Sequence, residues 1–200
     1  MLTYVLIAAT VLVSWLAFDN PKAKQRLLLW PPAVERHRQY DRLLTHGFVH
    51  ADWQHLLFNM LTLYFFGLRV EDAMTQSVGP VVFVLFYLSA IVVAILPSYL
   101  RHRRDAGYSS LGASGGVSAV LFAGILLQPW TLVFIPIPMP AIVYAVAYVA
   151  YSFWMDKRGG DGINHSAHLS GAIYGVLFML LMDPRVGPSF LQQLSNPQFR

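Results

Sequence analysis

The sequence contains no cysteine and few charged residues. Without cysteine, disulfide bonds, thiolate catalysis and cysteine-ligated metal centres are excluded. Asp, Glu, Lys and Arg make up only 12% of the 200 residues, compared with roughly a quarter in a typical soluble domain. Hydrophobic residues make up 56%. This composition indicates a membrane protein rather than an ordinary soluble domain.

The positive charge is small and unevenly spread. The formal net charge is +4 at pH 7, and the basic residues fall in clusters between apolar runs. Clusters of this kind indicate contact with lipid headgroups rather than with nucleic acid. We therefore predict a lipid bilayer, and no nucleic acid, as the surroundings of this chain.

Six apolar segments are candidates for membrane-spanning helices, which need roughly 17–25 apolar residues. They are Leu2–Phe18, Trp53–Leu68, Pro80–Leu100, Gly115–Gln128, Pro140–Met155 and Ile163–Met182. The first lacks the basic region and the small-residue cleavage site of a signal peptide, so we expect it to be retained. The sequence predicts an all-α membrane protein, a six-transmembrane-helix bundle over residues 1–183. A polar tail over residues 184–200 is expected to be poorly ordered.

Two parts of this layout are unusual. The first connection, residues 19–52, is long and mixes aromatic and apolar residues with Lys and Arg, which favours a position in the membrane interface. The fourth segment is too short to cross a bilayer and follows the polar stretch DAGYSSLGAS. Irregular backbone at membrane depth is tolerated only where protein buries it or a wet cavity adjoins it. We therefore expect a short recessed fourth helix that begins partway into the membrane. Ser114 would stand at its N-terminus, with water directly above it.

Polar residues inside the other segments bear on the role of Ser114. A lone serine in an apolar helix usually bonds to a carbonyl of its own helix or lets two helices pack closely. His55 and Asn59 are four residues apart and share one helix face, where they could equally serve as an interhelical hydrogen-bonding pair. His168 lies one turn before a GxxxG face formed by Gly171 and Gly175, a pattern that allows close approach of a neighbouring helix.

If that neighbour is the fourth helix, His168 meets Ser114. A serine hydroxyl needs a base within reach to become a nucleophile, and a neutral histidine can take its proton and later protonate a leaving amine. Adjacent glycines leave room for a carbonyl group, and the Ser114 amide is free to donate to an oxyanion. His55 and Asn59 could supply further donors. These residues suit acyl transfer, although no acid is obvious behind the histidine.

Three motifs in this order carry a family resemblance. They are HGFVHADWQHLLFN at 46–59, GASG at 112–115 with Gly112 and Gly115, and AHLSGAIYG at 167–175 with Gly171 and Gly175. Together they make the chain similar to the rhomboid intramembrane serine proteases. The six segments and the long first connection agree, so the resemblance covers nearly the whole chain.

The resemblance implies a catalytic dyad of Ser114 and His168 with no required aspartate, cofactor or metal. It implies an oxyanion site made of the Ser114 amide, His55 and Asn59. It also implies substrates that are transmembrane proteins, which enter sideways near the second and fifth helices and are cut near small or helix-breaking residues. Gly and Pro at such positions lower the cost of unwinding a helix. We expect a multi-pass protein of the cytoplasmic membrane of a prokaryote.

The sequence departs from the family pattern at two places. Ser118 stands four residues after the nucleophile, where an aromatic residue often packs on the catalytic histidine. Asp41 precedes Arg42 where the family often has Trp-Arg, so Arg42 is expected to keep a structural role without the tryptophan. We interpret the remaining histidines near the motifs, His46, His50 and His165, as residues that orient or hydrate the site.

The membrane orientation is open, because two arguments conflict. The family arrangement places the N-terminus in the cytoplasm and the active site near the opposite face. The positive-inside rule would instead place the active-site face in the cytoplasm. The connections on that face carry eleven of the fourteen Lys and Arg: Lys22, Lys24, Arg26, Arg36, Arg38, Arg42, Arg101, Arg103, Arg104, Lys157 and Arg158.

Three alternative functions compete with this interpretation. A catalytically silent rhomboid-like protein that binds transmembrane helices would be expected to lack Ser114 or His168. A zinc site could combine His165 and His168 with His50 or His55, but the sequence has no HExxH motif and no carboxylate among them. A small transporter would suit the short fourth segment, but no internal repeat supports it.

Overall fold

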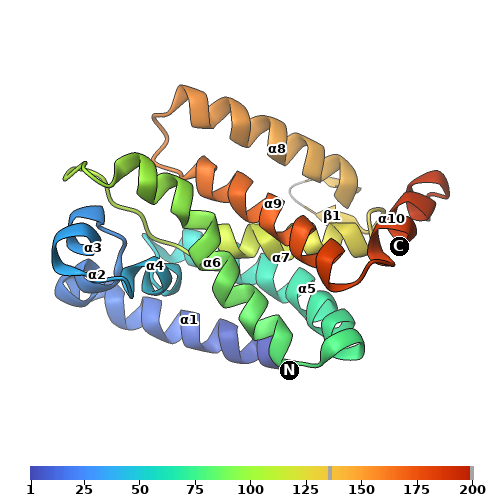
Figure 1. Ribbon diagram of the computed structural model, residues 1–200, viewed down its shortest axis with the longest axis horizontal. Coiled ribbons are helices and arrows are strands. Elements are labelled where there is room, and N and C mark those ends of the chain that lie inside the picture. Colours follow the sequence, from blue (N-terminus) through green and yellow to red (C-terminus); the bar gives the residue numbers. More distant parts are fainter. Residues whose placement is uncertain (135–136, 199–200) are drawn as a thin grey trace.

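The computed structural model describes residues 1–134 and 137–198, and its helices confirm the predicted all-α class. In chain order the elements are α1 (Leu2–Phe18), α2 (Pro21–Leu27), α3 (Pro31–His37), α4 (Arg42–Thr45), η1 (His46–Phe48), α5 (Trp53–Val78), α6 (Val81–His102), α7 (Ser114–Leu127), β1 (Leu132–Phe134), β2 (Pro138–Pro140), α8 (Ala141–Arg158), α9 (His165–Met182) and α10 (Val186–Ser195). The strands form one antiparallel hairpin. Figure 1 shows α1, α5, α6 and α9 along the length of the molecule, with α8 outermost.

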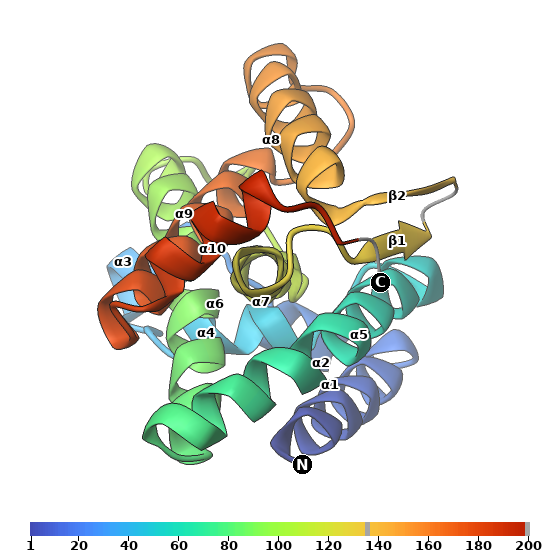
Figure 2. The same cartoon turned by 90° about the vertical axis from the view of Figure 1, so that its right-hand side faces the viewer.

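Helix α7 occupies the centre of the bundle. Figure 2 looks along it, with α5, α6 and α9 around it. Its sequence is apolar on all sides, and eleven of its 14 residues are buried, as expected of a helix that protein surrounds completely. At 1.5 Å per residue it is about 21 Å long, shorter than a hydrocarbon core of about 30 Å. Gly115, its second residue, lies against Gly171, the seventh residue of α9, so α7 begins below the start of α9.

The helices differ in whether their length and hydropathy suit them to cross a membrane. Within the described residues, α6 and α9 are long and apolar enough to span one, while α1 and α7 are apolar but shorter. Helix α5 begins at Trp53 as predicted but continues to Val78, through a charged stretch that includes Glu71 and Asp72. Many large apolar side chains of the outer helices are exposed, as expected where a surface meets an apolar medium. They include Val5, Leu12, Leu16, Leu57, Phe65, Val143, Val146, Phe153, Ile173, Leu177 and Leu181.

The closest helix contact joins α7 to α9. A Cβ atom added at Gly171 would overlap the Gly115 carbonyl, and one at Gly175 would overlap the Ala119 carbonyl. Both pairs advance by four residues, so the two helices run parallel and in register. The GxxxG face predicted on the last helix therefore packs on the backbone of the fourth.

The long first connection forms short helices rather than an extended loop. Proline stands in the first turn of both α2 and α3, where its missing N–H costs nothing. Arg42 is buried, and its Nη1 donates to the carbonyls of Gln25 at 2.8 Å and Leu28 at 2.6 Å. These contacts give Arg42 a structural role at the end of α2, in agreement with the expectation from sequence.

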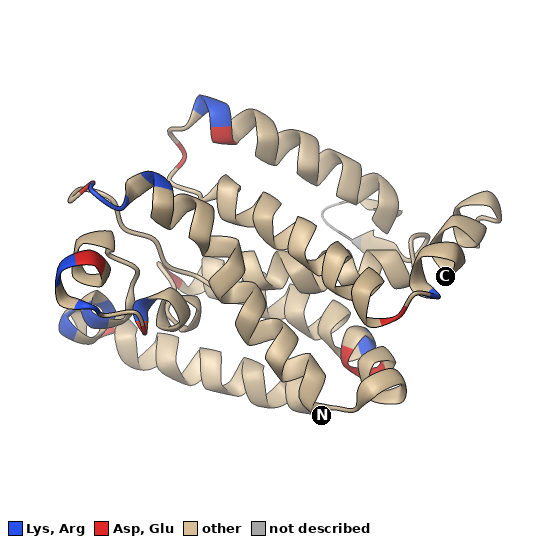
Figure 3. Ribbon diagram, viewed as in Figure 1, with Lys and Arg blue, Asp and Glu red and all other residues tan. Residues whose placement is uncertain are grey.

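The basic residues gather at one end of the molecule. Figure 3 shows Lys and Arg concentrated on α2, α3 and the C-terminal ends of α6 and α8. The last turns of α6 and α8 carry Arg101, Lys157 and Arg158. The loop that follows α6 leads into the N-terminus of α7, so the basic end and the Ser114 end of the bundle coincide.

The expectation of a poorly ordered tail is wrong for the segment that forms α10. Val186 is buried, and the indole Nε1 of Trp130 donates to the Gln193 carbonyl at 2.7 Å. The Gln193 side chain donates in turn to the Leu127 carbonyl at 3.1 Å, at the C-terminus of α7. Polar residues here pair with unsatisfied backbone groups, which composition alone does not reveal. Residues 199 and 200 of the predicted tail lie outside the described ranges.

The contact at Gly171 predicts that a larger residue there destabilises the fold. Replacing Gly171 by Ala should force α7 and α9 apart, because the new methyl group meets a carbonyl rather than a flexible side chain. Overpacking of this kind lowers the free energy of unfolding by about 1–3 kcal/mol. Thermal unfolding in detergent measures the loss. The control is Gly187→Ala in α10, where the methyl group would meet only the flexible Leu180 side chain; equal melting temperatures for the two variants would contradict the prediction.

Candidate active site

The turn that leads into α7 is held by the first connection. Leu29 and Ser110 exchange two backbone hydrogen bonds of 2.9 and 3.0 Å, and the Gly112 amide donates to the His46 carbonyl at 2.9 Å. Gly112 has a φ of +114°, which side chains with a Cβ rarely adopt. The glycine at the start of the GASG motif is thus required by the backbone of the turn, and the position of Ser114 follows from this turn.

His50, in the connection before α5, anchors the next residue of the turn. Its Nε2 accepts a hydrogen bond from the Ala113 amide at 3.2 Å, so its Nδ1 carries the proton. That Nδ1 lies 2.8 Å from the Ser14 hydroxyl, which itself donates to the Phe48 carbonyl. Burial lowers the pKa of His50 to about 3, which keeps the ring neutral. His50 therefore orients the backbone before Ser114, as the structural interpretation of this residue expects.

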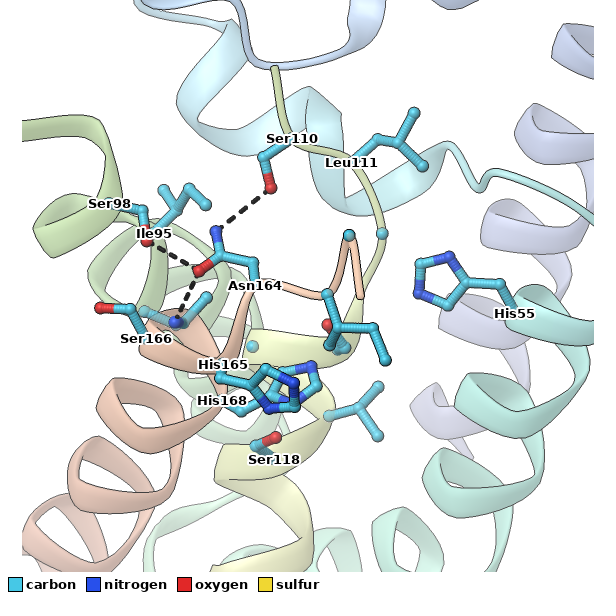
Figure 4. Close-up of a pocket in the computed structure, with 18 of the residues that line it drawn as sticks. His55, Ile95, Ser98, Ser110, Leu111, Ser118, Asn164, His165, Ser166 and His168 are labelled. Atoms are coloured by element: carbon cyan, nitrogen blue, oxygen red, sulfur yellow. Dashed lines mark hydrogen bonds between the residues drawn. The ribbon is translucent and has the colours of Figure 1, made fainter. Parts of the chain in front are cut away.

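Asn164 fixes the start of α9. Its Oδ1 accepts from the Ala167 amide at 3.0 Å, which caps the helix. The side chain also bonds to the hydroxyl groups of Ser98 in α6 and Ser110 in the loop before α7 (Figure 4). It donates to the hydroxyl of Tyr108 in the same loop as well. The sequence analysis overlooked Asn164, although an asparagine just before an apolar helix is a known capping signal. The cap ties the first turn of α9 to the loop that carries Ser114.

One cavity joins the four residues that the motifs single out. It has a volume of about 1040 Å³, and its lining includes Ser114 of α7, His168 of α9, and His55 and Asn59 of α5. Ser114 and His168 are half-buried, and Asn59 is buried. The structure therefore brings together, at the beginning of α7, side chains from three helices that are far apart in sequence.

His55 and Asn59 approach this cavity from α5. Figure 4 shows His55 pointing from α5 toward the loop that enters α7. A Cβ atom added at Gly112 would lie 2.8 Å from the His55 Nε2, so the ring packs directly on the glycine turn. The side-chain amide of Asn59 donates to the His55 carbonyl at 2.9 Å. The His55 ring therefore lies beside the turn that precedes Ser114, and Asn59 lines the same cavity.

Two rings flank His168. Tyr148 of α8 is stacked on it, with ring centroids 5.8 Å apart and planes 26° apart. His165 meets it edge-on, with centroids 5.5 Å apart, and Figure 4 shows both histidines beside Ser118. Tyr148 is not predictable from the sequence, because nothing in the local pattern of α8 distinguishes one of its aromatic residues from the others.

A carboxylate contacts His165 rather than His168. Asp161 Oδ2 lies 2.8 Å from His165 Nε2, and the hydrogen bond from His165 lowers the pKa of Asp161. Among the described residues, the buried Nδ1 atoms of His165 and His168 have no hydrogen-bonding partner. Within the same part of the chain, no three His, Asp or Glu side chains lie close enough to share a metal ion. The alternative zinc site is therefore not assembled.

Comparison with known proteins agrees with the motifs. The family model described as Rhomboid domain matches residues 37–185, which contain the three helices that carry Ser114, His168, His55 and Asn59. The mitochondrial RHOMBOID-like protein 12 of Arabidopsis thaliana is 26% identical over 86% of this chain and 55% of its own length. The chloroplastic Rhomboid-like protein 11 of the same plant is 32% identical over 71% of this chain and 52% of its own length.

A bacterial relative matches over most of both chains. The putative rhomboid protease YdcA of Bacillus subtilis is 25% identical over 90% of this chain and 87% of its own length. By contrast, the chain spans only about half the length of the two plant relatives. The matched region holds the GASG turn, the GxxxG contact and the His55–Asn59 pair. The chain belongs to the rhomboid family of integral membrane proteins.

Proposed function

We propose that this chain is an intramembrane serine protease that hydrolyses peptide bonds in or near transmembrane segments of other membrane proteins. The observation that carries the proposal is that Ser114, His168, His55 and Asn59 all line one cavity. Its position at the recessed start of a central helix suits a reaction that needs water inside an apolar protein. On the likeness to the bacterial relative, we place the protein in the cytoplasmic membrane of a prokaryote.

The chemistry uses Ser114 as nucleophile and His168 as base. His168 accepts the hydroxyl proton while the Ser114 oxygen attacks the substrate carbonyl carbon. The imidazolium then donates this proton to the leaving amine as the C–N bond breaks, and an acyl-enzyme remains. Water attacks the ester with His168 again as base, which releases the new carboxyl end and restores the serine. Ser114 and His168 are half-buried among apolar helices, where oriented hydrogen-bond donors act more strongly than in bulk water.

Three donors suit the negative oxygen of the tetrahedral intermediate. The first amides of α7 lack intrahelical acceptors, and Ser114 begins this helix. The helix dipole adds a partial positive charge at the same place. The His55 ring and the Asn59 amide lie on the α5 side of the cavity. This grouping supports an oxyanion site composed of the Ser114 amide, His55 and Asn59.

The walls of the cavity support the proposed substrate class. They include Tyr144, Tyr148 and Met155 of α8 and also Phe58, Asn59 and Thr62 of α5. A transmembrane segment entering between α5 and α8 would reach Ser114 without leaving the bilayer. Its helix must unwind to expose a carbonyl, so segments with Gly or Pro near the cut are the preferred substrates.

Labelling with a fluorophosphonate probe tests the nucleophile. The detergent-solubilised parent should be labelled at Ser114, as located by peptide mass spectrometry. Ser114→Ala and His168→Ala should not be labelled, because one lacks the nucleophile and the other its base. The control Ser109→Ala removes an exposed serine and should label like the parent. A folded parent that stays unlabelled in both detergent and lipid would favour the catalytically silent, helix-binding alternative.

The oxyanion donors predict a graded loss. His55→Ala and Asn59→Ala should each slow labelling by on the order of a hundredfold to a thousandfold, the loss seen when one oxyanion donor is removed. The second-order rate constant of labelling measures this loss, since the phosphonate oxygen occupies the oxyanion position. Gln76→Ala removes an exposed amide from the same helix and serves as the control. Rates within twofold of the control for both variants would remove these side chains from the oxyanion site.

A further inference from the structure

The ring of His168 is held by packing rather than by a hydrogen bond to Nδ1. That atom is buried and has no partner among the described residues. The surfaces against the ring are Tyr148, stacked at 5.8 Å, and the edge of His165 at 5.5 Å. A side chain fixed in this way keeps its orientation only while both neighbouring rings stay in place.

Tyr148 is in turn held by α7. Its hydroxyl lies 2.6 Å from the Ser118 hydroxyl, and its ring lies 5.7 Å from the ring of Phe122. Ser118 is buried and stands one turn after Ser114, on the same face of the helix. Tyr148 therefore contacts the helix that carries the nucleophile and the ring of the base at the same time.

The small side chain at position 118 makes this arrangement possible. An aromatic side chain at that position would project from α7 toward His168, where the Tyr148 ring now lies. Serine leaves the space open and supplies a hydroxyl that pairs with the ring arriving from α8. The aromatic residue that the family often has at this position of α7 is thus replaced here by one from a different helix.

Helix α8 is the most lightly held wall of the cavity. Only four of its 18 residues are buried, namely Ala141, Ala145, Ser152 and Met155. Figure 2 shows it at the edge of the molecule, away from α1 and α5. Because Tyr148 belongs to this helix, any outward movement of α8 also withdraws the ring from His168.

We propose that Tyr148 is a positioning residue for His168, so that the base is oriented only while α8 is seated against α7 and α9. The inference rests on the proposed protease function and adds a residue on which the orientation of its base depends. Loss of Tyr148 therefore slows the chemical step rather than binding.

The test measures labelling of Ser114 by a fluorophosphonate over a range of probe concentrations. Tyr148→Ala should lower the limiting rate by on the order of tenfold to a hundredfold, the effect of a misplaced catalytic group, with little change in the half-saturating concentration. Tyr148→Phe keeps the ring and should retain most of the rate. The control Phe153→Ala removes an exposed aromatic residue of the same helix, which contacts Lys157 rather than His168, and should match the parent.

A double variant separates positioning from general stability. In Ser118→Tyr combined with Tyr148→Ala, the ring moves to α7 and can again lie beside His168. It should recover most of the limiting rate that Tyr148→Ala alone loses. Melting temperatures of all variants are measured alongside, so that a fold defect is visible.

Each outcome decides the inference. A Tyr148→Ala variant that labels at the limiting rate of the parent overturns it and leaves the proposed function intact. A double variant that regains the melting temperature but not the rate also overturns it. A parent that is not labelled at Ser114 refutes the proposed function, and this inference with it. A rate that is lost in Tyr148→Ala, kept in Tyr148→Phe and regained in the double variant supports it.

Discussion

The close contact between the backbones of α7 and α9 is the constraint on which the rest of the structure depends. Gly171 and Gly175 leave no room for a side chain against the carbonyls of Gly115 and Ala119. The contact sets the two helices parallel and in one register, with the recessed start of α7 beside the second turn of α9. Ser114 precedes Gly115 by one residue and His168 precedes Gly171 by three, so the geometry of the cavity follows from the absence of two methyl groups. The outer helices then need only surround this pair.

The irregular backbone around the start of α7 follows from the same constraint, because a recessed helix needs a loop that descends into the protein. Peptide groups in an apolar interior must find partners. They find them in the first connection, where Leu29 pairs with Ser110 and the His46 carbonyl accepts from Gly112. The His50 ring completes the series at Ala113. Polar residues that look out of place in a membrane sequence thus provide hydrogen-bonding partners for the backbone of this buried loop.

Sequence alone predicts the large helices well, because the length of an apolar run and its flanking residues are local properties. Helix α1 was predicted to the residue, and α7 to within one residue at each end. The pairing of α9 with α7 was also predictable, since GxxxG carries its own geometric reason. Asn164, Tyr148 and α10 were missed because their roles depend on partners distant in sequence, at Ser98, His168 and Trp130. The short helices α2 and α3 were missed because each has too few residues to show a periodic pattern.

The hydrogen bond from Asn59 to the carbonyl of His55 has a consequence for selectivity between reaction stages. This bond uses one of the two N–H groups of the Asn59 amide and leaves the other for a second acceptor. The bonded N–H holds the side chain in one orientation, so the remaining N–H would need no reordering to meet a developing negative oxygen. Because a charged oxygen is a stronger acceptor than a neutral carbonyl, the proposed intermediate would gain more from this N–H than the bound peptide does.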